Sequence, residues 1–97
     1  MRISLSDEAE ADANAATDWY VADGAILAAE DFANAIERAF ARLIDFPHIG
    51  KRTAHEARML TLHDFPYSVI YRIHGDEVRI IAIAHHSRRP GYWAGRR

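Results

Sequence analysis

The sequence contains no cysteine among its 97 residues, which excludes disulfide cross-links and thiolate metal sites. It also lacks an uninterrupted apolar run long enough to cross a membrane and the apolar core of a signal peptide. Its few glycines form no phosphate-binding loop, and no serine lies in a nucleophile elbow. These absences, together with the length, predict one soluble, cytoplasmic domain spanning residues 1–97.

Six histidines raise the question of a metal site. His85 and His86 are adjacent in a predicted strand and therefore point to opposite faces, so they cannot chelate one ion together. No carboxylate lies four residues from a histidine on a predicted helix. We therefore expect neither a metal nor any other cofactor.

The formal net charge of -2 hides an uneven distribution of charge along the chain. Residues 1–45 hold ten acidic and three basic side chains, whereas residues 46–97 hold nine basic and four acidic ones. All basic residues but one are arginine, which suits bidentate contact with carboxylate or phosphate. Two interpretations stay open. The acidic residues simply solvate a helical surface and the arginines a sheet surface, or the arginines bind an anionic partner such as nucleic acid or an acidic protein segment.

Two β-rich runs, Tyr67–His74 and Glu77–His85, flank Gly75-Asp76 and predict an antiparallel hairpin with a two-residue loop. Counting outward from this loop pairs Tyr71 with Ile80, Val69 with Ala82 and Tyr67 with Ala84 on one apolar face. The same count places three pairs on the opposite face: Arg72 with Arg79, Ile70 with Ile81, and Ser68 with Ile83. His85 is the next residue of the second strand on that face. We expect the first face to belong to the hydrophobic core and the second to be an exposed functional surface.

The rest of the chain supplies two helices and two strands. Arg2–Leu5 alternates like a short strand, and Ser6 is a predicted N-cap of a helix that ends near Ala22. A second helix is predicted from Ala25 to Asp45, and Arg58–His63 alternates like a strand after the polar connection 51–57. The predicted fold class is α+β, with an antiparallel helical hairpin on one face of a small antiparallel sheet and the other face open.

An apolar strip with a cationic border is predicted on the open face. Its apolar members are Ile70, Ile81 and Ile83, and an exposed strip of this kind marks a partner site. The predicted partner-binding set adds the surrounding and C-terminal residues Arg72, Arg79, Arg88, Arg89, Tyr92, Trp93, Arg96 and Arg97. The alternative is that a C-terminal turn carrying Tyr92 and Trp93 folds back over the strip.

A metal-free acid–base site for RNA cleavage is a second hypothesis. Such a reaction needs a base, an acid and cations that stabilise the phosphorane. The residues of the right chemical types are Arg58, His85 or His86, Arg88 and Tyr92. The competing interpretation is purely structural, with His85 ending a strand and the arginines solvated.

Residues across nearly the whole chain carry a family resemblance. They are Tyr20, Gly24, Phe32, Ile36, Leu43, Pro47 with Gly50, Arg58 with Leu60, residues 65–73, Asp76 with Val78, residues 80–85, Arg88, Pro90, Tyr92 and Trp93. This pattern resembles the RelE/ParE family of bacterial type II toxins. The resemblance implies the fold predicted above and neutralisation by a cognate antitoxin, a small acidic protein of ribbon-helix-helix or similar type.

One position helps to place the chain within that family. The nucleases resembling RelE carry an arginine after the first tyrosine of the hairpin, where it contacts the scissile phosphate, and lysines on the preceding strand. Here Ser68 follows Tyr67, and Met59 and Thr61 occupy the preceding strand. The pattern is closer to the ParE branch, which implies a toxin that binds and inhibits DNA gyrase without catalysis. The alternatives are a ribosome-dependent mRNA endoribonuclease and an inactive stabilisation module.

Overall fold

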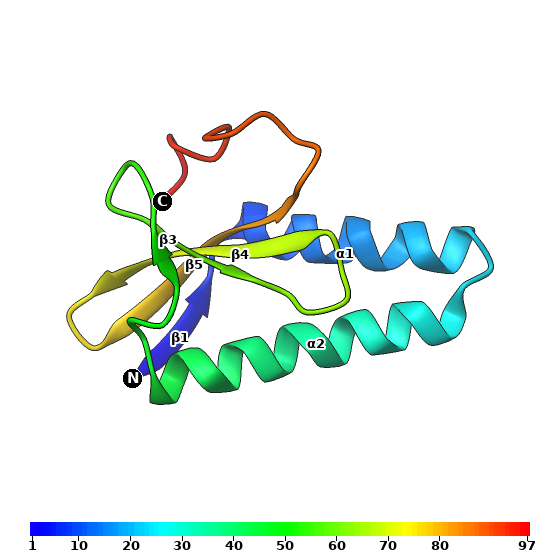
Figure 1. Ribbon diagram of the computed structural model, residues 1–97, viewed down its shortest axis with the longest axis horizontal. Coiled ribbons are helices and arrows are strands. Elements are labelled where there is room, and N and C mark those ends of the chain that lie inside the picture. Colours follow the sequence, from blue (N-terminus) through cyan, green and yellow to red (C-terminus); the bar gives the residue numbers. More distant parts are fainter.

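The computed structural model describes residues 1–97 as two helices packed on a five-stranded sheet (Figure 1). The elements, in chain order, are β1 (Arg2–Leu5), α1 (Asp7–Ala22), α2 (Ile26–Asp45), β2 (Lys51–Arg52), β3 (Arg58–Thr61), β4 (Tyr67–His74) and β5 (Glu77–His85). The predicted α+β class is confirmed, with each helix and hairpin strand within one residue of its predicted bounds. Neither helix has the length and apolar character needed to cross a bilayer.

The sheet is mixed, whereas the sequence predicted an antiparallel one. Its strand order is β1-β5-β4-β3-β2, and β1 pairs with β5 in parallel. The connection from β1 to β5 contains the helical hairpin of α1 and α2 and then the strands β2, β3 and β4, so the parallel pair joins the two ends of the chain. The two-residue strand β2, in the predicted polar connection, pairs with β3 at the far edge.

Local sequence explains how the helices begin and pack. The Ser6 hydroxyl accepts a hydrogen bond from the Ala9 backbone N–H at 3.0 Å, as expected of an N-cap. Gly24 takes a positive φ of 75° in the turn between the helices. The apolar stripe of α2 buries Phe32, Ile36 and Leu43 against the sheet.

A β-bulge in β5 changes the register of the hairpin. Tyr71 pairs with Ile80 as predicted, but Ile70 pairs with Ala82, so Ile81 is an extra residue in β5. Beyond the bulge, Val69 pairs with Ile83 and Tyr67 with His85, and the predicted partners Ala82 and Ala84 are wrong. Because the side-chain period is two, the shift turns Ile83 towards the helices.

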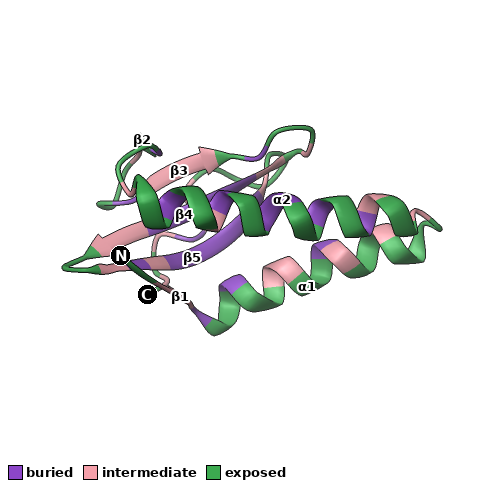
Figure 2. Cartoon of the chain, turned by 90° about the horizontal axis from the view of Figure 1, so that it is seen from below, coloured by how far each residue is buried: buried purple, intermediate pink, exposed green.

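The central strands β4 and β5 are mainly buried (Figure 2), and side chains pack against both of their faces. One core joins Val69, Tyr71, Ile80 and Ile83 to the helices. A second, smaller core on the other face contains Ile70, Ile81, Ala82 and Ala84, packed with Ala57 and Trp93. The predicted open face is therefore wrong: residues 86–97, hereafter the C-terminal arm, fold back over it on the side away from α2 (Figure 1). This is the alternative in which Trp93 covers the strip.

Tyr71 connects the sheet to the segment after α2. Its buried hydroxyl donates to the Pro47 carbonyl at 2.7 Å and accepts from the Gly50 N–H at 2.9 Å. Burial raises the pKa of this hydroxyl above its usual value, although the Gly50 N–H and the charge of Arg58 oppose the shift. A Cβ at Gly50 would lie 2.5 Å from the Tyr71 oxygen, so this close approach requires glycine.

We predict that Tyr71→Phe lowers the free energy of unfolding by about 1–3 kcal/mol, because it leaves a buried N–H and a carbonyl without a partner. Denaturant melts measure the change. Tyr20→Phe is the matched control, since the partly buried Tyr20 packs by its ring against Phe32 and Phe65. Equal stabilities of the two variants would show that the Tyr71 hydroxyl does not stabilise the segment after α2.

Candidate functional site

The C-terminal arm is a series of turns fixed to the sheet by Arg72. The Arg72 guanidinium donates to the carbonyls of Arg96 at 2.6 Å and Ala94 at 3.2 Å. Its Nε donates to the His55 carbonyl at 3.0 Å, in the loop between β2 and β3. Arg72 therefore ties the arm to β4 and to that loop, and each of its three guanidinium nitrogens already donates one hydrogen bond within the chain.

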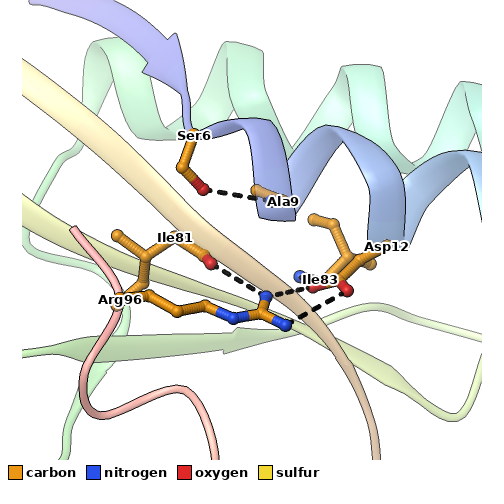
Figure 3. A network of polar contacts seen from close by, with 6 residues as sticks. All are labelled: Ser6, Ala9, Asp12, Ile81, Ile83 and Arg96. Atoms are coloured by element: carbon orange, nitrogen blue, oxygen red, sulfur yellow. Dashed lines mark hydrogen bonds and ion pairs between the residues drawn. The ribbon is translucent and has the colours of Figure 1, made fainter.

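A second anchor joins the arm to α1 and β5 (Figure 3). Arg96 pairs with Asp12 through Nη1 and Oδ2 at 2.6 Å, and the same nitrogen donates to the Ile81 carbonyl at 3.2 Å. The Ile83 N–H donates to Asp12 Oδ2 at 3.1 Å. Since β1 covers β5 only as far as Ile80, these contacts satisfy backbone groups beyond its end.

Asp12 also favours the charged form of Arg96. Burial acts to lower the pKa of Arg96, but the hydrogen bond and charge of Asp12 outweigh it, and the pKa is raised above its usual value. The guanidinium is charged at neutral pH, as in other arginines, and the carboxylate compensates for its burial. Both side chains are largely buried, at 20% exposed for Arg96 and 17% for Asp12, so water screens the pair weakly.

Two hollows flank Tyr92 and share the side chains of His85, Arg88 and Tyr92. One, of about 270 Å³, opens over Met59, Ser68 and Ile70, and the other, of about 210 Å³, opens toward α1. The Arg88 guanidinium carbon stacks over the Tyr92 ring at 4.0 Å from its centroid. Exposed Arg88 and Arg89 thus place positive charge at the rim of a partly apolar hollow.

The two adjacent histidines belong to separate hydrogen-bonded groups. His85 Nδ1 accepts from the Ser87 N–H at 3.0 Å, so the proton of the neutral ring is on Nε2. The ring of His85 packs edge-on against Tyr67. His86 Nε2 lies 3.0 Å from the hydroxyl of buried Ser68, which in turn lies 3.2 Å from the Thr61 hydroxyl. No group of three or more potential ligands is placed to hold a metal ion.

Burial raises the pKa of the Tyr92 hydroxyl above its usual value, and the charge of Asp12 raises it further, against the opposing effects of Arg96 and Arg88. Tyr92 is therefore protonated at neutral pH and can donate a proton or a hydrogen bond, but it cannot act as a base. The site combines two arginines, two imidazoles and neutral hydroxyls around an apolar floor.

The structure brings together only some of the predicted nuclease residues. His85, His86, Arg88 and Tyr92 line the larger hollow. Arg58 lies elsewhere, where its Nη1 donates to the carbonyls of His48 at 3.1 Å and Gly50 at 2.9 Å.

Most of the predicted partner-binding residues are not free. Ile70, Ile81 and Ile83 are at most 2% exposed, so the predicted exposed strip is wrong. Trp93 is buried over Ile70 and Ile81. Besides Arg72 and Arg96, Arg79 donates within the chain, to the Ser4 hydroxyl and the Arg97 carbonyl. The exposed members are Arg88, Arg89 and Arg97, with Tyr92 partly exposed.

Asp12 is the residue of this region that sequence reasoning missed. It lies three residues after Ala9 and four before Ala16, both of which are buried, so helical periodicity places it beside the buried face of α1. A carboxylate in that position needs a partner. The signal was present in the sequence, although the identity of the partner was not.

We predict that Asp12→Ala lowers the free energy of unfolding by about 1–3 kcal/mol, because it leaves the Ile83 N–H without a partner and the Arg96 guanidinium without its carboxylate. Trypsin should then cut after Arg88 faster than in the unchanged protein, since the arm loses an anchor; the bond after Arg89 is followed by Pro90 and resists trypsin. Asp18→Ala removes an exposed carboxylate from the same helix and is the control. Identical cleavage rates in both variants would contradict an anchoring role for Asp12.

Known proteins share the sequence pattern and the fold of this chain. The family model described as the ParE toxin of the type II toxin-antitoxin system, parDE, matches residues 3–90. A solved structure of the chromosomal ParDE TA system from P. aeruginosa aligns with a TM-score of 0.77 and 26% sequence identity, covering 88% of this chain and 95% of that chain. No curated protein sequence matches the chain. The chain belongs to the ParE toxin family of type II toxin-antitoxin systems.

Proposed function

We propose that this toxin arrests growth by binding and inhibiting DNA gyrase, without catalysis of its own, and that a cognate antitoxin neutralises it. Family membership supports the toxin class and implies an antitoxin partner. The main observation against a nuclease is the environment of the Ser68 side chain. Its hydroxyl is buried between Thr61 and His86, where the nucleases resembling RelE hold an arginine.

That difference matters because phosphodiester cleavage develops negative charge on the phosphorane. The hydroxyls of Ser68 and Thr61 are neutral and hydrogen-bonded to each other, so they supply no cation at the floor of the hollow. The cations, Arg88 and Arg89, are at its rim. Removal of one stabilising group of this kind commonly slows a reaction by about 10²–10³-fold.

The same rim has the composition of a binding surface. Arg88 is held over Tyr92 by stacking, which reduces the freedom that an arginine loses on binding. Arginine and tyrosine are enriched among residues that contribute most to protein–protein affinity. We therefore assign gyrase contact to the exposed residues Arg88 and Arg89, with Tyr92, and not to the buried strip.

One observation favours the endoribonuclease as a second candidate. His85, His86, Arg88 and Tyr92 share one hollow, and His85 Nε2 and the Tyr92 hydroxyl can donate hydrogen bonds to a ligand there. An inactive stabilisation module has no comparable support. The decisive comparison is thus between a binder and a nuclease that use the same rim.

Supercoiling by purified gyrase tests the proposal. The toxin should inhibit supercoiling, and Arg88→Glu Arg89→Glu should raise the inhibitory concentration about tenfold or more, because it reverses the charge of the contact. His85→Ala His86→Ala should leave inhibition intact. Arg38→Glu Arg42→Glu makes the same charge change on exposed positions of α2 and is the control.

Primer extension on mRNA from arrested cells tests the rival. Codon-spaced cuts that vanish in His85→Ala His86→Ala, with supercoiling untouched by the unchanged toxin, would falsify the gyrase proposal and establish the nuclease. Inhibited supercoiling without such cuts supports the binder.

Antitoxin recognition should depend on the same exposed arginines. An acidic, amphipathic antitoxin segment complements Arg88, Arg89 and Arg97 and can fold as it binds. We predict that Arg88→Glu Arg89→Glu weakens antitoxin binding in a calorimetric titration, and more strongly at low salt than at high salt. The control is again the double change in α2. Equal affinity at low salt would show that the antitoxin binds elsewhere.

A further inference from the structure

A separate cationic hollow of about 500 Å³ lies beside β2 and β3. Its wall includes His48 from the segment after α2, Arg52 and Arg58 from the two strands, and Thr53 and Glu56 from the loop between them. It reaches β4 near Ile73, whereas the hollows beside the arm lie over the Tyr67 and Ser68 end of that strand. The size is that of a small-molecule site.

Two arginines meet in this hollow without a carboxylate partner. Arg52 is directly opposite Arg58 in the antiparallel ladder, so the two side chains leave the same face of the sheet. Like charges in this arrangement repel each other. The ion pairs of the chain are Arg2 with Asp76, Arg96 with Asp12, and His63 with Asp64, so none of them neutralises this pair. An anion between the two guanidinium groups would remove the repulsion.

The backbone around the hollow is fixed in an unfavourable conformation. His55 and Glu56 both have a positive φ, of 61° and 58°, although neither is glycine. The loop is closed by a hydrogen bond of 2.9 Å from the Thr53 N–H to the Ala57 carbonyl, and Arg72 holds the His55 carbonyl. Conformations of this kind concentrate at binding sites, where the surrounding structure maintains them.

Arg58 is positioned before any ligand arrives. Its Nη1 donates to the carbonyls of His48 and Gly50, which fixes the plane of the guanidinium and leaves Nη2 and Nε without a partner within the chain. Arg52 is exposed and can close on a ligand from the opposite side. The His48 imidazole and the Thr53 hydroxyl add donors suited to anionic oxygens.

We infer that this hollow binds a phosphate group, either free or in a nucleic-acid backbone, between Arg52 and Arg58. Arginine binds phosphate through paired N–H donors, and two guanidinium groups can hold adjacent oxygens of one phosphate. The carboxylate of Glu56 on the same wall opposes the anion and limits its affinity. Phosphate binding here is independent of the gyrase surface at Arg88 and Arg89.

Nuclear magnetic resonance of the ¹⁵N-labelled full chain tests the inference. Inorganic pyrophosphate and a short single-stranded DNA oligonucleotide are titrated separately, and the amide shifts of residues 48–58 are followed. We expect saturable shifts in this range. Saturation by pyrophosphate indicates free phosphate compounds, and tighter, salt-dependent saturation by the oligonucleotide indicates a nucleic-acid backbone.

Three variants are expected to change the phosphate affinity in different ways. Arg52→Gln should weaken binding about tenfold or more, since it removes a charge-assisted contact. Glu56→Gln should strengthen binding severalfold, because it removes the opposing charge while retaining the side-chain length. Arg38→Gln, on exposed α2, should change little.

Three outcomes overturn the inference. They are the absence of shifts at residues 48–58, shifts confined to residues 86–97, and equal losses of affinity in Arg52→Gln and Arg38→Gln. Amide shifts outside the hollow report whether each variant keeps its fold, so a binding defect is distinguishable from unfolding.

Discussion

The extra residue Ile81 in β5 sets the geometry on which the C-terminal third of the protein depends. By shifting the register, the bulge sends Ile83 to the helical core and keeps Ile81 under the arm. It lies just beyond the end of β1, where the backbone of β5 would otherwise lack partners. Asp12 and Arg96 supply them, so one local irregularity explains why α1 carries a buried carboxylate and why the arm ends beside it.

The arginines of this protein divide into internal and external groups by their contacts. Arg72, Arg79 and Arg96 donate to hydroxyl, carbonyl or carboxylate oxygens within the chain and hold the arm in place. Arg88 and Arg89 are exposed and remain available to a partner. A count of positive charges therefore overstates the binding surface, because covering an apolar sheet face with a turn-rich segment leaves carbonyls that need donors.

Much of the fold follows from the sequence because its signals are local. The Ser6 cap, the α2 stripe and Gly75 in the hairpin loop each act within a few residues. The bulge could not be predicted, since residues 80–84 are apolar at every position and alternation carries no register there. Burial of Ile70 and Ile81 by Trp93 could not be predicted either, because an exposed tryptophan of the same sequence could equally contact a partner protein.

The Asp12–Arg96 pair joins residues 84 positions apart in the chain. Likewise β1 has no strand to pair with until residues 77–80 exist. During synthesis, α1 and α2 can form early from local contacts, whereas the edge of β5 and the arm can close only after nearly all of these residues have left the ribosome. Until these residues have emerged, the nascent chain exposes its sheet-facing apolar residues, and a chaperone present at that stage meets a different surface from that of the folded domain.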